Sequence, residues 1–433
     1  MKIKEIALEN IRGMSSLHWH LPDGKEAAGW HVILGDNGAG KSSFLRAVAI
    51  GLIGVERSAQ LWVDFSGWLR QQTSTGSITI QVQPEAPDKA TGPGGRATHV
   101  GYKLLIQLLQ IGEEGVATMT MENQRKSGFR GVWRSTTGWF SAGFGPFRRF
   151  TGGDREYDKL FYSNPRLAAH LSLFRENVAL TEALEWLRQL KFQTFEGKGE
   201  GFFTQLQAFI NQPDFLPHGT QLEEVSSAGV FFRDANAQRI GIDDLSDGFR
   251  SVLSLTFELL RQLQASYGDK LFEEKQGVLR VKVPGVVLID EIDVHLHPLW
   301  QKRIGYWLTT HFPKVQFFVT THSPLVCQAS ELGTVFRLPS PGQLDDRGGM
   351  VEGAELGRLI YGNVLEAYGT EVFGLVSTQS DSAHQKLDTL AELNQKALTT
   401  TLSDKEEITR DELRSILPIS DSQAFLDKML AEL

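Results

Sequence analysis

The residues with the clearest chemistry form a glycine-rich segment, Gly35-Asp36-Asn37-Gly38-Ala39-Gly40-Lys41-Ser42, which fits the pattern G-x-x-x-x-G-K-[ST]. Glycines allow backbone N–H groups to wrap around a phosphate, and a helix beginning at Lys41 would add its partial positive charge. The Lys41 ammonium can bridge β- and γ-phosphate oxygens, and the Ser42 hydroxyl can ligate Mg²⁺. A glycine turn without a ligand could match by coincidence, but the flanking patterns favour a nucleoside triphosphate site. Its expected binding residues are Asn37, Gly38, Ala39, Gly40, Lys41, Ser42 and Ser43.

A pair of carboxylates, Asp290 and Glu291, directly follows the apolar run 286–289. At the carboxyl end of a strand beside the phosphate-loop strand, Asp290 could hold Mg²⁺ through water, and Glu291 could polarise the attacking water. Adjacent carboxylates also occur on ordinary surfaces. Because an unpaired charge next to a buried strand is costly, this position favours a catalytic pair.

Three histidines lie near these carboxylates or after another apolar run. His322 comes two residues after the run 317–320, where it could contact a γ-phosphate, although a lone histidine after a strand is often structural. His295 and His297 are two residues apart, a spacing that invites a metal site. No cysteine or third histidine accompanies them, which favours a structural loop that shapes the site.

The spacing of apolar residues predicts the elements that carry this chemistry. Residues 284–289 form a continuously apolar run, typical of a parallel strand covered on both faces, and the mainly apolar runs 30–34 and 317–320 also predict buried strands. Helical spacing begins at Lys41 and recurs over 160–210 and from Val252. Alternation with period two, which predicts strands and an antiparallel lobe, covers residues 1–9 and 77–121. In an open α/β sheet ligands bind at the carboxyl ends of the strands, so Lys41, Asp290 and His322 should share one rim.

Composition limits the class of protein. The chain has 433 residues, 41% of them apolar, a net charge of -8 and a single cysteine, Cys327. This length provides a real core and two or three domains, so a disordered or fibrous chain is excluded. One cysteine permits no internal disulfide, and no apolar run approaches the roughly 18 to 20 residues of a membrane helix. We therefore expect a cytoplasmic protein without a membrane segment.

Together these motifs resemble the ATP-binding-cassette ATPases of the SMC, RecF and OLD type. The matching segments are IKEIALENIRGM, GDNGAGKSS, LSDGFRS at 245–251, VVLIDEIDVHLHP at 286–298 and VTTHS. The resemblance implies an α/β fold, namely an ABC-type P-loop ATPase head with a mixed sheet, an antiparallel β lobe, a helical insertion and a small α-helical C-terminal region. It also implies a composite site in which Ser246, Asp247 and Gly248 of a second subunit close over the γ-phosphate. Taken alone, LSDGFRS could equally be the N-capped start of an ordinary helix.

The same resemblance suggests four segments: the first part of the head at 1–75, a β lobe and helical insertion at 76–235, the second part of the head at 236–330, and a mostly helical region at 331–433. The last segment offers no D-x-D after an apolar strand, so we expect no Toprim nuclease. Its capping-box spellings at Ser403/Glu406, Thr409/Glu412 and Ser420/Gln423 predict short helices. From residue 384 onward it carries 10 acidic and 6 basic residues, which suits a partner-docking surface.

A stretch at 122–150 mixes arginines and lysine with aromatics: Arg125, Lys126, Arg130, Arg134, Arg148, Arg149, and Phe129, Trp133, Trp139, Phe140, Phe144, Phe147, Phe150. Residues 125–149 could bind nucleic acid through phosphate contacts and stacking. Alternatively, the aromatics are core residues and the arginines a solvated edge. A third interpretation is that Arg148 or Arg149, in GFGPFRR, senses phosphate. The glutamine that the family places near the nucleotide is not identifiable, and Gln71 or Gln72 are candidates only.

The resulting hypothesis is an ATPase that binds ATP and Mg²⁺ and dimerises head to head on ATP. In it Ser42 and Asp290 hold the metal, Glu291 orients the water and His322 contacts the γ-phosphate. Resemblance to ATPase subunits of Septu, retron-linked and PARIS-type systems implies a separate nuclease or toxin as effector in prokaryotic antiviral defence. Two alternatives stay open: a RecF-like repair or replication ATPase acting on DNA, and a scaffold that uses ATP as a structural clamp.

Overall fold

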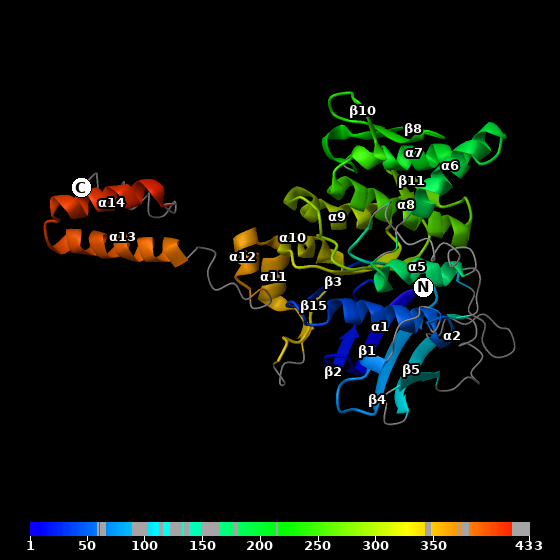
Figure 1. Cartoon of the computed structure of the whole chain (residues 1–433), viewed down its shortest axis with the longest axis horizontal. Helices are drawn as coiled ribbons and strands as arrows, with labels where there is room; N and C mark the ends of the chain where they lie inside the picture. The colour runs from blue at the N-terminus through cyan, green and yellow to red at the C-terminus, as the bar shows by residue number, and fades with distance from the viewer. Residues whose placement is uncertain are drawn as a thin grey trace. The chain divides into compact units, whose positions relative to one another are not determined.

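The structure is a computed structural model in which two compact units, residues 1–373 and 374–433, are each described by themselves. The residues described are 1–58, 60, 66–88, 102–111, 116–121, 132–133, 138–148, 150, 164–176, 178, 181–213, 215–342, 348–370, 373 and 381–417. Figure 1 shows that the first unit contains the sheets and most of the helices. Among the described helices, none combines the length and apolar character needed to cross a bilayer.

The centre of the first unit is a six-stranded, mostly parallel sheet in the order β16-β15-β3-β14-β13-β7. Its strands are β3 (Gly29–Leu34), β7 (Ser141–Phe144), β13 (Gly285–Ile289), β14 (Val315–Thr320), β15 (Thr334–Arg337) and β16 (Gly349–Met350). Every residue of β3, β13 and β14 is buried, which confirms the continuously apolar runs as interior strands. The strand before Asp290 is not beside the phosphate-loop strand as expected, because β14 pairs with both and separates them.

A second, antiparallel sheet has the order β2-β1-β4-β5-β6. It consists of β1 (Lys2–Ile11), β2 (Met14–His20), β4 (Thr75–Gln83), β5 (Tyr102–Ile111) and β6 (Val116–Met121). The period-two segments therefore form strands as predicted. However, β1 pairs with β4, so one sheet crosses the boundary that the sequence placed at residues 75 and 76. Backbone pairing between distant segments, which local pattern does not report, accounts for the difference.

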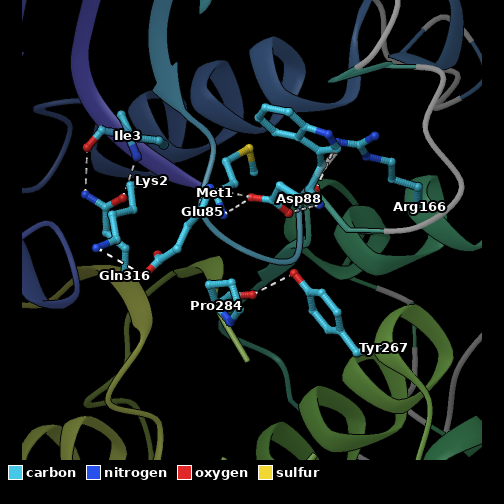
Figure 2. Close-up of polar contacts among 10 residues, drawn as sticks. Met1, Lys2, Ile3, Glu85, Asp88, Arg166, Tyr267, Pro284 and Gln316 are labelled. Atoms are coloured by element: carbon cyan, nitrogen blue, oxygen red, sulfur yellow. Dashed lines mark hydrogen bonds and ion pairs between the residues drawn. The ribbon is translucent and has the colours of Figure 1, made fainter. Parts of the chain in front are cut away.

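Helix α1 (Lys41–Ile53) lies between the two sheets, as Figure 1 shows. Gly51 permits this close packing, because a Cβ there would lie 2.4 Å from Cδ1 of Ile80 on β4 and would force that side chain to shift. The buried Gln316 side chain on β14 also joins the sheets: it accepts from Ile3 N at 2.6 Å and donates to Ile3 O at 3.0 Å (Figure 2). The phosphate loop and the parallel sheet are thus held against a rigid second layer.

Beyond the sheets, helices and small hairpins complete the first unit. The helices are α2 (Val55–Ser58), α5 (Pro165–Phe174), α6 (Thr181–Phe195), α7 (Glu200–Ile210), α8 (Asp247–Tyr267), α9 (Pro298–His311), α10 (Pro324–Cys327), α11 (Gly353–Tyr361) and α12 (Val364–Tyr368). The remaining strands are β8 (Gln221–Ser226), β9 (Gly229–Arg233), β10 (Arg239–Gly241), β11 (Phe272–Lys275) and β12 (Val278–Val281). The helices expected over 160–210 are confirmed, and α8 begins five residues before the predicted Val252.

The predicted C-terminal segment 331–433 divides between the two units. β15 pairs with β3 in the central sheet, so residues up to 373 belong with the first unit. The second unit contains α13 (Asp381–Thr399) and α14 (Asp404–Ile416), which pack through Leu390, Leu413 and Leu417. Ser403 and Glu406 form the predicted capping box, with Ser403 N donating to Glu406 Oε2 at 2.9 Å. Thr409 and Glu412 instead lie inside α14, and Ser420 and Gln423 lie outside the described residues.

Two fully buried histidines make the stability of the first unit depend on pH. Burial lowers the pKa of His31 to about 4 and that of His170 to about 3. His31 Nε2 lies 2.8 Å from the carbonyl of Ala27 and Nδ1 lies 2.9 Å from Thr334 Oγ1, so the neutral ring has a partner on each side. Between about pH 6.5 and 4 the unfolded chain binds protons that the native chain excludes, so stability falls as the pH is lowered.

We expect the free energy of unfolding to drop by about 2–3 kcal/mol between pH 7.5 and 5.5 as a result of these two histidines. Urea unfolding followed by tryptophan fluorescence would measure it, because all 9 tryptophans precede residue 374. Replacing His31 with glutamine should remove about half of the dependence, whereas the same change at the exposed His20 should leave it intact. Unfolding that is independent of pH in this window would contradict the prediction.

Candidate functional site

The segment from Gly35 to Ser42 connects β3 to α1, as the sequence predicts for a phosphate loop. Gly38 and Gly40 adopt positive φ angles of 83° and 95°, which glycine reaches without strain. Such a turn directs successive backbone N–H groups toward one point at the start of a helix. The geometry is that of an anion cradle at a helix N-terminus.

Lys41, the first residue of α1, lies folded against this loop. Its Nζ donates to the carbonyls of Gly35 at 2.7 Å and Asp36 at 3.0 Å, and the residue is only 6% exposed. Burial lowers the pKa of Lys41, while the carboxylates of Glu291, Asp290 and Asp36 oppose that shift. This electrostatic coupling means that the structure brings the predicted lysine and the predicted acidic pair to the same end of the sheet.

The acidic pair is held by Thr320, the last residue of β14. Thr320 Oγ1 donates to Asp290 Oδ1 at 2.6 Å and accepts from the backbone N–H of Glu291 at 2.7 Å. Glu291 itself has a φ of 45°, a conformation that is costly for a residue with a Cβ and persists where surrounding contacts impose it. Asp290 is 1% exposed. One hydroxyl therefore orients both carboxylate residues, and a threonine in VTTHS that we did not select from the sequence has a positioning role.

His322 lies just beyond the end of β14 and is exposed, so its ring is available to a ligand at this rim. The turn that carries it is fixed on both sides. The Ser323 side chain accepts from Leu325 N at the start of α10, and it also donates to Gln301 Oε1 at 2.7 Å. Gln301 in turn donates to Leu296 O at 2.9 Å, which ties the histidine turn to the loop after Glu291.

The predicted signature residues open α8. Ser246 is the N-cap residue with an extended backbone, and Asp247 pairs with Arg250 one turn later. A Cβ on Gly248 would lie 2.8 Å from the carbonyl oxygen of His295, so this glycine permits close contact between the helix and the loop after Glu291. The start of α8 is thus packed against the acidic loop of the same chain.

The basic and aromatic stretch is mostly interior where it is described. Trp133, Trp139, Phe140, Phe144 and Phe150 are at most 8% exposed, and only Phe147, at 43%, faces solvent. This favours the interpretation of these aromatics as core residues. Several residues of the stretch lie outside the described residues, namely Arg125, Lys126, Phe129, Arg130, Arg134 and Arg149.

Arg148 does not match the prediction of a phosphate sensor. Its guanidinium is buried and donates to protein acceptors, among them the carbonyls of Gly145 at 2.9 Å and Asp290 at 2.8 Å. A guanidinium whose donors are engaged in this way has no N–H group to offer a phosphate. The sequence could not distinguish this interior arginine from a surface one.

A second cation near the phosphate loop was not selected from the sequence. Arg12, in the turn after β1, donates from Nη1 to Ser43 Oγ at 3.2 Å and lies 4.7 Å from the ring centroid of Trp68. Burial and the nearby Arg46 lower its pKa. The signal was the segment IKEIALENIRGM, which supports the family resemblance but gives no separate indication of a role for Arg12. Gln71 and Gln72 lie in an exposed turn before β4.

The paired histidines after Glu291 have local structural roles. His297 is the N-cap residue of α9, where its side chain accepts from Leu299 N, and His295 has a positive φ of 65°. No group of three or more His, Cys, Asp or Glu side chains that could hold a metal occurs in the described part of the chain. These contacts agree with the expected structural loop.

Comparison with known proteins finds relatives that are named as Septu proteins and as probable ATPases. A protein-family profile described as "AAA domain, putative AbiEii toxin, Type IV TA system" matches residues 143–328, which include the acidic pair and His322. Septu protein PtuA of Bacillus mycoides is 25% identical over 326 residues, and the retron Ec83 probable ATPase of Escherichia coli is 24% identical over 400 residues. The chain resembles Septu PtuA and retron ATPases. The resemblance to Septu and retron ATPases that the sequence indicated is thereby confirmed.

These alignments cover different shares of the relatives. The match with PtuA spans 75% of this chain and 38% of PtuA, and the match with the retron Ec83 protein spans 78% and 71%. The SMC head domain from Thermotoga maritima aligns over 82% of this chain and 99% of its own, at 14% identity and a TM-score of 0.41. The mixed sheet, antiparallel sheet and helices described above give the expected α/β class independently of that match.

Proposed function

We propose that the chain binds and hydrolyses ATP at the end of the parallel sheet where Lys41 meets Asp290 and Glu291. The observation that carries the proposal is this convergence: a nearly buried lysine on a glycine loop interacts electrostatically with Asp290 and Glu291. Thr320 holds the carboxylate of the first and the backbone of the second. Backbone N–H groups of Asn37–Ser43 and the Lys41 ammonium would hold the phosphates. Glu291, fixed at its backbone, would orient a water for in-line attack, and the exposed His322 would contact the γ-phosphate.

The oxygen donors of this site fit Mg²⁺. Thr320 engages Asp290 Oδ1, which leaves Oδ2 for a metal-bound water, and the Ser42 hydroxyl follows Lys41 on the loop. Mg²⁺ bound there would neutralise charge on the β- and γ-phosphates. Lys41, Ser42 and Asp290 would position the nucleotide, and Glu291 would hold the water against it.

We further propose that hydrolysis takes place in a head-to-head dimer, in which Ser246, Asp247 and Gly248 of one subunit meet the nucleotide of the other. Ser246 is the N-cap residue of α8, and its side chain makes no capping hydrogen bond. Its hydroxyl can therefore donate a hydrogen bond to a phosphate at the start of the helix. The similarity to PtuA and the retron ATPase supports a role in antiviral defence, in which the dimer gates a separate nuclease or toxin. The acidic helices α13 and α14 would dock that effector.

The rival function on DNA loses support among the described residues. The aromatics proposed as stacking platforms are buried, apart from Phe147, and Arg148 is engaged with protein carbonyls. A scaffold that binds ATP without turnover would not need the imposed positive φ of Glu291.

A concentration series tests the dimer directly. Because a shared site forms only on association, the ATPase rate per subunit should rise at least about tenfold between nanomolar and micromolar protein, as the population of dimer increases. Phosphate release should be measured together with mass photometry over the same range. A rate that stays constant while the mass changes from monomer to dimer would contradict hydrolysis at a shared site.

A further inference from the structure

Arg148 makes an unusual set of contacts for a side chain outside the phosphate loop. Its five N–H donors face five protein oxygens. Nη1 donates to the carbonyls of Gly145 and Asp290, and Nη2 reaches the carbonyls of Glu291 at 3.1 Å and Ile292 at 3.5 Å. Nε donates to Ser251 Oγ on α8 at 3.2 Å.

These acceptors belong to three elements that the proposed chemistry requires to stay in register. Gly145 follows β7, the carbonyls of residues 290–292 form the turn that carries Glu291, and Ser251 lies in the second turn of α8. The guanidinium is planar and rigid, so its N–H groups keep fixed directions relative to one another. A displacement of one acceptor element therefore changes the hydrogen bonds that Arg148 makes with the other two. Gly248, in the first turn of α8, touches the carbonyl of His295 and provides a second contact between the same two elements.

The Arg148 guanidinium remains charged at neutral pH. Burial lowers the pKa of Arg148 to about 10, and the carboxylates of Asp290, Asp293 and Glu291 oppose the shift. An arginine that is buried without a direct carboxylate partner is costly, and a hydrophobic side chain could fill the space at lower cost. Packing alone therefore does not explain an arginine here, whereas a need for directed hydrogen bonds does.

We propose that Arg148 is a positioning residue that couples α8 to the backbone of residues 290–292, so that engagement of the start of α8 sets the position of Glu291. The inference rests on the proposed ATPase function and deepens it. When Ser246 and Gly248 meet the nucleotide of the second subunit, any shift of α8 is passed through Ser251 and Arg148 to the turn that holds the attacking water. Hydrolysis is in this way tied to closure of the dimer.

Removing the hydroxyl of Ser251 tests the proposed coupling between α8 and residues 290–292 with the smallest change to the side chains involved. Ser251→Ala deletes only the contact between Arg148 and α8 and leaves the four contacts with carbonyls, and alanine is a good helix residue. We expect kcat to fall about tenfold through mispositioning of Glu291, with KM for ATP nearly unchanged. The melting temperature should fall by only a few degrees, because Nε of Arg148 alone loses its acceptor. The matched control is Ser254→Ala, one turn along the same buried face, where the hydroxyl bonds only to Ser251 O in its own helix.

Further readouts separate positioning from stability. Ser251→Thr keeps the hydroxyl and should restore kcat to within about twofold, since the hydrogen bond to Arg148 is retained. Equal kcat values for wild type and Ser251→Ala would overturn the coupling, as would equal losses in Ser251→Ala and Ser254→Ala. If the wild-type chain itself hydrolyses no ATP above the level of Lys41→Ala, the proposed function has failed instead, so the two failures are distinguishable.

Discussion

Replacing Glu291 with glutamine should lower kcat by about a thousandfold and trap an ATP-bound dimer. An amide cannot accept a proton from the attacking water, and loss of a positioned general base typically costs between about a hundredfold and ten thousandfold in rate. Glutamine preserves the size of the side chain, and the backbone contact with Thr320 uses only the Glu291 N–H. Binding of ATP should therefore survive the substitution while its consumption stops.

Measurements of ATP turnover and of the molecular mass of the complex together test this prediction. Phosphate release should be compared with mass measured by light scattering in the presence of ATP, ADP and no nucleotide. Glu274→Gln, an identical change at an exposed position in the β11–β12 hairpin, serves as the control and should behave as wild type. A Glu291→Gln protein that remains monomeric with ATP bound would argue against the composite site, and one that retains full turnover would remove Glu291 from the mechanism.

The parts of the site that could be predicted from sequence are those in which the functional residues and the backbone conformation they need lie in the same short segment. The glycines before Lys41 are needed for positive φ angles, and the apolar runs before Asp290 and His322 form buried strands. Each of these signals lies within one strand, turn and helix. The carboxyl ends of parallel strands then share an edge for geometric reasons, so the rim could be inferred without knowing the order of the strands.

Strand order was not predictable in the same way. β14 lies between β3 and β13, and β1 pairs with a strand more than sixty residues away along the chain. Such pairings depend on which exposed backbone edges meet during folding, and within each sheet the strands concerned have similar apolar patterns. Local periodicity identifies a strand but does not identify its neighbour.

The environment of a single residue is also hard to predict from sequence, as Arg148 and the capping-box motifs show. Arginine is usually a surface residue, and nothing in GFGPFRR indicates that Arg148 is interior and bound to carbonyls of residues 290–292. Likewise, Ser403/Glu406 starts α14 while Thr409/Glu412, with the same spacing, lies within it. A capping box works only where the chain before it is not helical, so its outcome depends on the neighbouring turn.

Replacing Lys41 with alanine should weaken ATP binding by about a hundredfold or more and abolish measurable turnover. A charge-assisted hydrogen bond to phosphate contributes about 1.5–3 kcal/mol, and Lys41 can make more than one at a nearly buried position. Its present partners, the carbonyls of Gly35 and Asp36, are exchanged for phosphate oxygens at little cost. Alanine also leaves Asp290 and Glu291 without their neighbouring cation, which raises electrostatic repulsion toward the nucleotide.

Isothermal titration calorimetry with a slowly hydrolysed ATP analogue and Mg²⁺ would measure the loss of affinity independently of catalysis. Lys314→Ala, the same change at an exposed lysine between α9 and β14, should bind as wild type does, because Lys314 is remote in the chain from the phosphate loop and faces solvent. Lys41 sits on the first turn of α1, where alanine is well tolerated, so a folded variant is expected. Affinity within a few fold of wild type in folded Lys41→Ala would mean that the nucleotide, if bound at all, does not use this loop, and the assignment of the site would then be wrong at its strongest point.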